Sequence, residues 1–135
     1  MFDRCLYFNL NALVRKVNKI WVDAFAEYDL SPAHAYLLRL VAASPGLRQT
    51  EISHELKLEK STITRFIDVM VERGFLRRKK EGREQLIYPS QKTLQIVDSL
   101  NKTGSKLYKE MSQTLGSSEL KSVVGDLRDM SNKLA

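Results

Sequence analysis

The chain has 135 residues, 43% of them hydrophobic and 28% charged, and a formal net charge of +6. This length fits one compact domain, with or without a helical extension, and leaves no room for a separate catalytic domain. The composition excludes a disordered tail, and no apolar stretch approaches the roughly 20 residues that span a bilayer. Asp3 and Arg4 interrupt the N-terminal residues where a signal peptide would continue, and the single cysteine, Cys5, cannot form an internal disulfide. We therefore expect a cytoplasmic protein without a membrane partner.

The excess positive charge is concentrated in one quarter of the chain. Residues 60–92 hold nine basic and four acidic residues, whereas residues 1–30 and 31–59 each balance, and residues 93–135 hold six and five. A surface that binds phosphates needs such a local excess, because Lys and Arg displace condensed counterions. The alternative is that these charges only keep the protein in solution. This alternative is less favoured where the charged segment coincides with a motif.

Apolar residues near the N-terminus predict a long helix. Spacings of four and three, typical of one seam along a helix, place Leu6, Leu10, Leu13, Val17, Ile20 and Ala24 in line. The stripe is widened by Tyr7, Val14, Trp21 and Phe25. Because a lone exposed helix carries less apolar surface, we expect this helix to pack against a large partner surface.

Two further helices follow. Ser31 and Pro32 predict the N-cap and first turn of a second helix, which ends at Ser44-Pro45-Gly46. A third helix is predicted from about Gln49 to Leu56, and residues 57–59 make a short turn into a fourth.

The fourth helix carries one apolar and one polar face. Its apolar positions keep helical spacing, and they are Ile63, Phe66, Ile67 and Met70. Gly74 stands where a left-handed C-terminal cap is expected. The opposite face holds short hydrogen-bonding groups and one arginine, a set that suits base edges and phosphates: Ser61, Thr62, Arg65 and Asp68, with Thr64 and Val69 on the flank. Two short helices joined by a tight turn predict a helix-turn-helix.

A basic hairpin is predicted next. Residues 75–79 and 85–90 favour extended structure, and residues 80–84 between them contain a glycine. Pro89 is tolerated only on an edge or at a strand end. The basic residues of this segment are Arg77, Arg78, Lys79, Lys80 and Arg83. A basic two-stranded ribbon beside a recognition helix is typical of a DNA-binding wing.

These segments resemble the MarR-type winged-helix regulators over nearly the whole chain. The resemblance rests on Leu30-Ser31-Pro32 at the entry to the second helix and on Leu47-x-Gln49-x-x-Ile52-Ser53-x-x-Leu56 in the third. It is most specific in KSTITRFID (60–68) followed by ERGFLRR (72–78), and Glu81-Gly82-Arg83 is similar to the acidic-x-Arg motif of the wing. The resemblance implies a homodimer whose terminal helices interdigitate and whose two winged domains bind a pseudo-palindromic operator in double-stranded DNA.

The C-terminal part supports a dimer independently. Apolar residues predict two more helices, one with Leu94, Val97, Leu100, Leu107, Met111 and Leu115, the other with Leu120, Val123, Val124, Leu127 and Met130. Gly116-Ser117-Ser118 divides them. Together with the first helix, they are expected to bury one another across a twofold axis, because DNA half-sites one helical turn apart require two recognition helices. A three-helix layer within one chain is the alternative.

The predicted fold is therefore mainly α with a small β-hairpin wing. Residues 1–135 form a single domain, with the winged helix-turn-helix in 31–92 and the dimerisation layer in 1–29 and 93–135. We expect a sequence-specific transcriptional regulator, a repressor, with DNA contacts from Gln49, Thr50, Lys60, Ser61, Thr62, Thr64, Arg65, Arg77, Arg78, Lys79, Lys80 and Arg83. The main alternative is a winged-helix module that binds protein and lacks specific DNA binding.

The sequence predicts no catalytic residue, metal site or cofactor. His34 and His54 are isolated, and there is no phosphate-binding glycine loop, zinc-ligand pair or nucleophile elbow. Each histidine is interpreted as a surface or helix-packing residue.

The resemblance also implies a regulatory pocket. MarR-type proteins often bind small aromatic or phenolic anions between the helical layer and the winged domain, and the candidates here are Asn11, Arg15, Trp21, His34 and Tyr36. Trp21 and Tyr36 could stack on an aromatic ring, and Arg15 or His34 could pair with a carboxylate. Ordinary core or surface roles are the alternative. Some relatives sense peroxide through a cysteine in the first helix, but for Cys5 we favour a buried, inert thiol.

Overall fold

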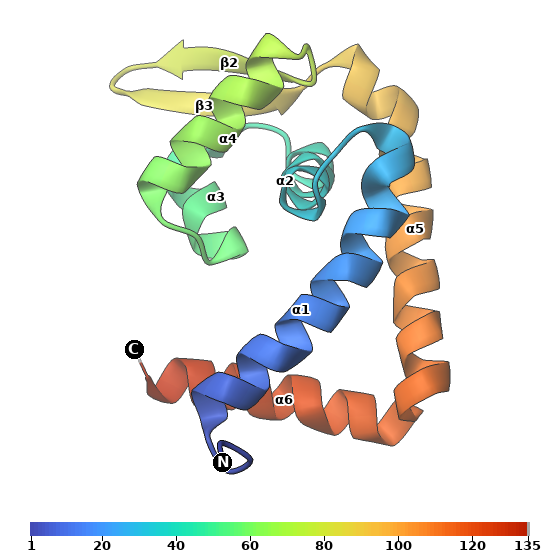
Figure 1. Cartoon of the computed structure of the whole chain (residues 1–135). Helices are drawn as coiled ribbons and strands as arrows, with labels where there is room; N and C mark the ends of the chain where they lie inside the picture. The colour runs from blue at the N-terminus through green and yellow to red at the C-terminus, as the bar shows by residue number, and fades with distance from the viewer. Residues whose placement is uncertain (135) are drawn as a thin grey trace. The chain divides into compact units, whose positions relative to one another are not determined.

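The computed structural model describes residues 1–134, which form helices and three short strands (Figure 1). The elements in chain order are α1 (Leu6–Phe25), the 3₁₀ turn η1 (Ala26–Tyr28), α2 (Pro32–Ala43), β1 (Leu47–Arg48), α3 (Gln49–Leu56), α4 (Lys60–Glu72), β2 (Leu76–Glu81), β3 (Glu84–Pro89), α5 (Gln91–Leu115) and α6 (Ser117–Lys133). The chain divides into two compact units, and the first ends at Asn101 within α5. The winged helix-turn-helix lies wholly in this first unit.

The predicted helix boundaries are confirmed in the winged region. The Ser31 hydroxyl caps α2 by accepting a hydrogen bond from the His34 backbone N–H, at 3.1 Å. The third helix ends where Lys57 adopts a left-handed conformation with φ of 55°. After α4, Gly74 has φ of 82°, which an L side chain rarely adopts.

The core of the first unit draws on almost every element. Its large apolar side chains that are fully buried are Phe25, Leu37, Leu38, Val41, Ile52, Ile63, Ile67, Met70, Ile87 and Leu100. Three of these come from α4, so the opposite face of that helix points to solvent. Phe66 is only partly buried, and its ring meets the His34 ring edge to face at 4.7 Å between centroids.

The sheet has three strands, where the sequence predicted two. The two-residue strand β1 pairs with β3, with Leu47 opposite Ile87 and Arg48 opposite Leu86. The strand order is β1-β3-β2, and all pairs are antiparallel. Two residues are too short to show a period of their own, so β1 is defined only by its partner strand. Pro89 ends the central strand β3, as its missing N–H requires.

The wing loop is also shorter than predicted. Glu81 pairs with Glu84, so the strands continue to a loop of two residues, Gly82 and Arg83, instead of the five expected. Gly82 has φ of 63°. A two-residue hairpin with glycine at the first loop position extends the strands, because its backbone twist matches theirs.

The second unit consists of the last part of α5 and of α6. Gly116 separates the two helices, as predicted, with φ of 93°. No residue of α6 is buried. The exposed apolar residues of this unit include Leu115, Val123, Val124, Leu127 and Met130.

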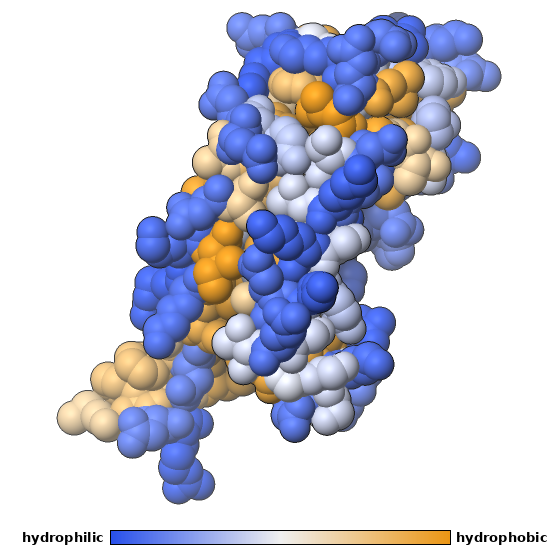
Figure 2. All heavy atoms as spheres, turned by 90° about the vertical axis from the view of Figure 1, so that its right-hand side faces the viewer, coloured by the Kyte–Doolittle hydropathy of each residue, from blue (hydrophilic) through white to orange (hydrophobic). Residues whose placement is uncertain are grey.

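Apolar side chains are also exposed on α1. They include Leu6, Tyr7, Phe8, Leu13, Val14, Ile20 and Val22. Figure 2 views the molecule from the right-hand side of Figure 1 and shows hydrophobic surface, in orange, among hydrophilic side chains, in blue. Within residues 1–134, no helix is both long enough and apolar enough to cross a membrane.

Candidate nucleic-acid interface

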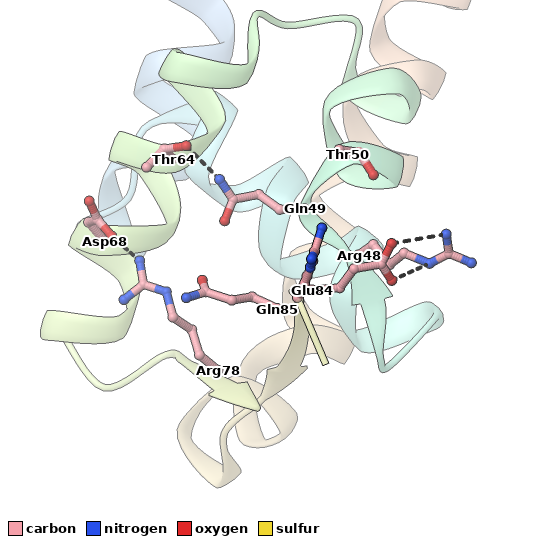
Figure 3. A pocket seen from close by; sticks show the side chains of 9 residues that line it. Arg48, Gln49, Thr50, Thr64, Asp68, Arg78, Glu84 and Gln85 are labelled. Carbon is pink, nitrogen blue, oxygen red and sulfur yellow. Dashed lines mark hydrogen bonds and ion pairs between the residues drawn. The ribbon is translucent and has the colours of Figure 1, made fainter. Parts of the chain in front are cut away.

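A concave site of about 600 Å³ lies where α3, α4 and the hairpin meet (Figure 3). We call it the concave site, and its lining residues are Arg48, Gln49, Thr50, Thr64, Asp68, Arg78, Arg83, Glu84 and Gln85. Five of the predicted DNA contacts are brought together here, namely Gln49, Thr50, Thr64, Arg78 and Arg83. Arg48, Glu84 and Gln85 also line the site and were not among the predicted contacts. The pairing of β1 with β3 brings Arg48 to the hairpin, and Glu84 and Gln85 belong to β3.

A hydrogen bond joins the two helices of the helix-turn-helix at this site. The Gln49 side-chain amide donates to the Thr64 hydroxyl, which in turn donates to the Lys60 carbonyl at 2.9 Å (Figure 3). Thr64 therefore links α3 to the first turn of α4. This bond connects the two helices at the exposed surface of the concave site.

Two of the arginines in the concave site are paired with carboxylates. Arg78 of β2 forms an ion pair and a hydrogen bond with Asp68 of α4. The Arg48 Nε lies 3.2 Å from a Glu84 carboxylate oxygen and 3.3 Å from one of Glu51. The first pair joins the hairpin to the recognition helix, and the second joins β1 to β3.

Four further predicted contacts of α4, Lys60, Ser61, Thr62 and Arg65, do not line the concave site. Ser61 and Arg65 are exposed, as is Lys60, and Thr62 is half-buried. Glu59 precedes the helix and its side chain does not cap it. The N–H groups of the first turn are thus left without a side-chain cap, an arrangement that favours nearby anions such as phosphates.

The basic residues of the wing do not form one patch. In the register of the hairpin, Arg77 and Lys79 lie on one face, opposite Tyr88 and Leu86, while Arg78 and Lys80 lie on the other. The Arg77 guanidinium lies over the Tyr88 ring, 6.0 Å from its centroid. A second cavity of about 350 Å³ is lined by Arg77, Arg78, Lys79 and Tyr88.

A separate apolar groove of about 300 Å³ lies between α1 and α2. Its lining residues are Val14, Val17, Asn18, Trp21, Pro32, Ala33 and Tyr36. The Trp21 indole N–H donates to the Tyr36 hydroxyl at 3.0 Å, so the structure brings these two predicted effector residues together.

The other three effector candidates do not line this groove. The Asn11 amide donates to the Tyr7 carbonyl at 2.7 Å within α1, and Arg15 is exposed on the same helix. His34 packs against Phe66 instead. Burial lowers the pKa of His34, and the nearby Arg73 guanidinium lowers it further. The groove therefore presents aromatic, aliphatic and amide groups and no charged side chain.

The expectation of a buried thiol is wrong for this chain. Cys5 is exposed, and it precedes α1 as the N-cap, where its sulfur accepts from the Phe8 N–H at 3.5 Å. A residue at the N-cap lies outside the helical seam, so the apolar residues of α1 do not cover it. Among residues 1–134, no three His, Cys, Asp or Glu side chains cluster as a metal site would need.

The fold and the site together define a winged helix-turn-helix: two short helices joined by a tight turn, with a basic hairpin beside the second helix. Residues 28–84 match the model of the MarR family. The winged helix-turn-helix of this chain is therefore similar to that of the MarR family, in agreement with the resemblance that the sequence predicted.

Solved structures of MarR-type regulators share the fold over nearly the whole chain. A MepR–DNA complex from S. aureus matches with a TM-score of 0.87 at 13% identity, covering 98% of this chain and 100% of that one. The transcriptional repressor CouR bound to a 23-mer DNA duplex matches with a TM-score of 0.86 at 20% identity, covering 96% and 94%. A MarR protein from Peptoclostridium difficile matches with a TM-score of 0.83 at 22% identity, covering 98% and 88%. A search of curated proteins finds no match.

Proposed function

We propose that this protein is a sequence-specific transcriptional repressor that binds double-stranded DNA as a homodimer. The observation that carries the proposal is the position of α4: its apolar side is buried in the core, and the side with Ser61, Thr62 and Arg65 faces outward beside the basic hairpin. An exposed helix of this kind fits the major groove, where short polar side chains and arginine contact base edges. MepR and CouR, which share the fold, were solved with DNA.

The homodimer is supported by the apolar surface that the chain leaves uncovered. Leu13 on α1 is 48% exposed, and Val123 and Leu127 on α6 are 47% and 39% exposed. Monomeric proteins rarely expose apolar residues in continuous helical stripes. Association through a twofold axis would bury these faces and would present two recognition helices to two half-sites.

The direct test is to select an operator from genomic fragments and to compare it with random duplex in gel-shift titrations. We expect tight operator binding and weaker, salt-sensitive binding to random duplex. A module that only binds protein would show no salt-sensitive affinity for either duplex, and that result would overturn the proposal.

We propose in addition that an aromatic effector releases the protein from DNA by binding in the groove between α1 and α2. The support is the apolar lining, in which Trp21 and Tyr36 can stack on a ring. Because no charged side chain lines the groove, an uncharged aromatic compound fits the lining better than the anion that the resemblance implies. Fluorescence of Trp21, the single tryptophan, reports binding directly. Matched neutral and anionic phenols should differ, with the neutral compound bound more tightly.

A further inference from the structure

The three arginines of the concave site differ in their partners. Arg78 is paired with Asp68, and Arg48 is paired with Glu84 and Glu51. Arg83, at the tip of the hairpin, forms no ion pair with any residue of 1–134. Two of the three cations that face this site are therefore already neutralised by the protein itself.

Asp68 places a carboxylate on the surface that is proposed to bind a polyanion. It lies on the recognition helix α4, its side chain is 57% exposed, and it lines the concave site. A carboxylate there repels phosphates and lowers the affinity for any duplex. Its one ion-pair partner among residues 1–134 is Arg78, whose side chain is 29% exposed. The pair holds the guanidinium toward α4 and keeps it from turning outward from β2 (Figure 3).

We infer that Asp68 is a specificity-determining residue. By pairing with Arg78, it keeps this arginine from binding DNA phosphates, whose contacts do not depend on the base sequence. The inference rests on the proposed DNA binding. On random duplex the protein is held by phosphate contacts alone, and it can shift until any free cation finds a phosphate. On the operator, base contacts by α4 fix the docked position, and Arg78 stays directed into the concave site. The pair therefore lowers random binding more than operator binding.

The test is Asp68→Asn, which removes the charge and keeps the shape of the side chain. We expect the affinity for random duplex to rise roughly threefold to tenfold at moderate salt, and its salt slope to steepen by about one unit, because Arg78 gains one phosphate contact. Operator affinity should rise by a smaller factor than the affinity for random duplex, so the ratio of operator to random affinity decreases. Glu72→Gln is the matched control: it removes a carboxylate one turn later on α4, outside the concave site. It should change random binding much less.

A double variant shows whether the effect passes through Arg78. In Asp68→Asn/Arg78→Ala, the gain on random duplex should disappear, and Arg78→Ala alone should leave the salt slope on random duplex unchanged. Thermal unfolding of each variant checks that the wing is intact. If Asp68→Asn weakens both duplexes together without a change in slope, the carboxylate only orders the wing and the inference is wrong. It is equally wrong if the gain persists without Arg78, or if neither duplex is affected.

These outcomes are distinct from a failure of the proposed function. If the unaltered protein shows no salt-sensitive affinity for any duplex, DNA binding itself is refuted, whatever Asp68→Asn does. If the unaltered protein binds the operator and Asp68→Asn leaves the ratio of operator to random affinity unchanged, only the role of Asp68 is refuted.

Discussion

The winged region and the long terminal helices use their apolar residues in opposite ways. In the winged region, Ile52, Ile63 and Ile67 are completely buried within one chain. On the terminal helices, Leu13 and Val123 remain about half exposed, although their spacing is just as regular. The winged region thus buries its apolar residues within one chain, with Phe25 of α1 and Leu100 of α5 added to its core, while other apolar residues of the terminal helices stay exposed.

This difference shows that helical periodicity identifies the apolar face of a helix. It does not identify the element that packs against that face. In the winged region, the covering elements are the helices α2 to α4 and the strand β3, which close around one another within about sixty residues. On α1 and α6, neighbouring elements leave residues such as Leu13 and Val123 exposed. We propose that a second copy of the chain supplies the missing cover, which makes folding of the winged region and assembly of the dimer separable.

The largest expected effect is on dimer formation through the exposed apolar residues of the terminal helices. Leu13→Asp or Leu127→Asp should prevent dimer formation and reduce operator binding to the non-specific level, a loss of roughly 4–10 kcal/mol. Sedimentation and operator titration should change together. Ser122→Asp is the control, because Ser122 is exposed on the side of α6 away from its apolar seam. If the wild-type protein is monomeric at micromolar concentration and still binds the operator tightly, the proposed homodimer is wrong.

The next effect is on stability. Ile67→Ala should lower the free energy of unfolding by about 2–5 kcal/mol, because it opens a cavity in a core that cannot collapse around it. Val69→Ala on the same helix should cost less than about 0.5 kcal/mol, since Val69 is 40% exposed. Denaturant unfolding at one protein concentration measures both. Equal losses for the two variants would contradict the placement of the core.

Within the winged region, we expect the recognition helix α4 to contact bases and the wing to contact phosphates. Arg65→Ala should cost about 1–3 kcal/mol on the operator and much less on random duplex, because Arg65 faces outward from α4. Lys80→Ala should weaken both duplexes alike and reduce the salt slope by about one unit. Titrations of both duplexes at several salt concentrations measure this. The roles would be reversed if Lys80→Ala removed only operator preference.

The smallest effect concerns pH. The pKa of His34 is lowered in the folded state by burial and by Arg73, so the unfolded chain binds more protons just below the ordinary pKa of about 6.5. The free energy of unfolding should therefore fall as the pH drops from about 7 through that value. His34→Gln should flatten this part of the curve, and His54→Gln is the control because His54 is exposed. Thermal unfolding between pH 5.5 and 7.5 shows the difference.

Part of the candidate site could be predicted because it lies on one helix. Ser61, Thr62 and Arg65 follow directly from the apolar stripe of α4, since a period of 3.6 residues fixes which side chains lie opposite the core. The wing residues follow from local charge. Arg48 and Glu84 could not be found this way, because they are 36 residues apart and meet only through the pairing of β1 with β3.

What the sequence determined by itself were the features that depend on neighbours along the chain. These are the helix ends at Ser31, Lys57 and Gly74, the apolar face of each helix, the basic hairpin and the winged helix-turn-helix that they compose. What only the tertiary structure decided were the features that depend on distant segments. The third strand and the pairing of Asp68 with Arg78 are of this kind. Strand pairing and side-chain ion pairs form between residues whose separation in sequence carries no period, so a linear pattern cannot place them.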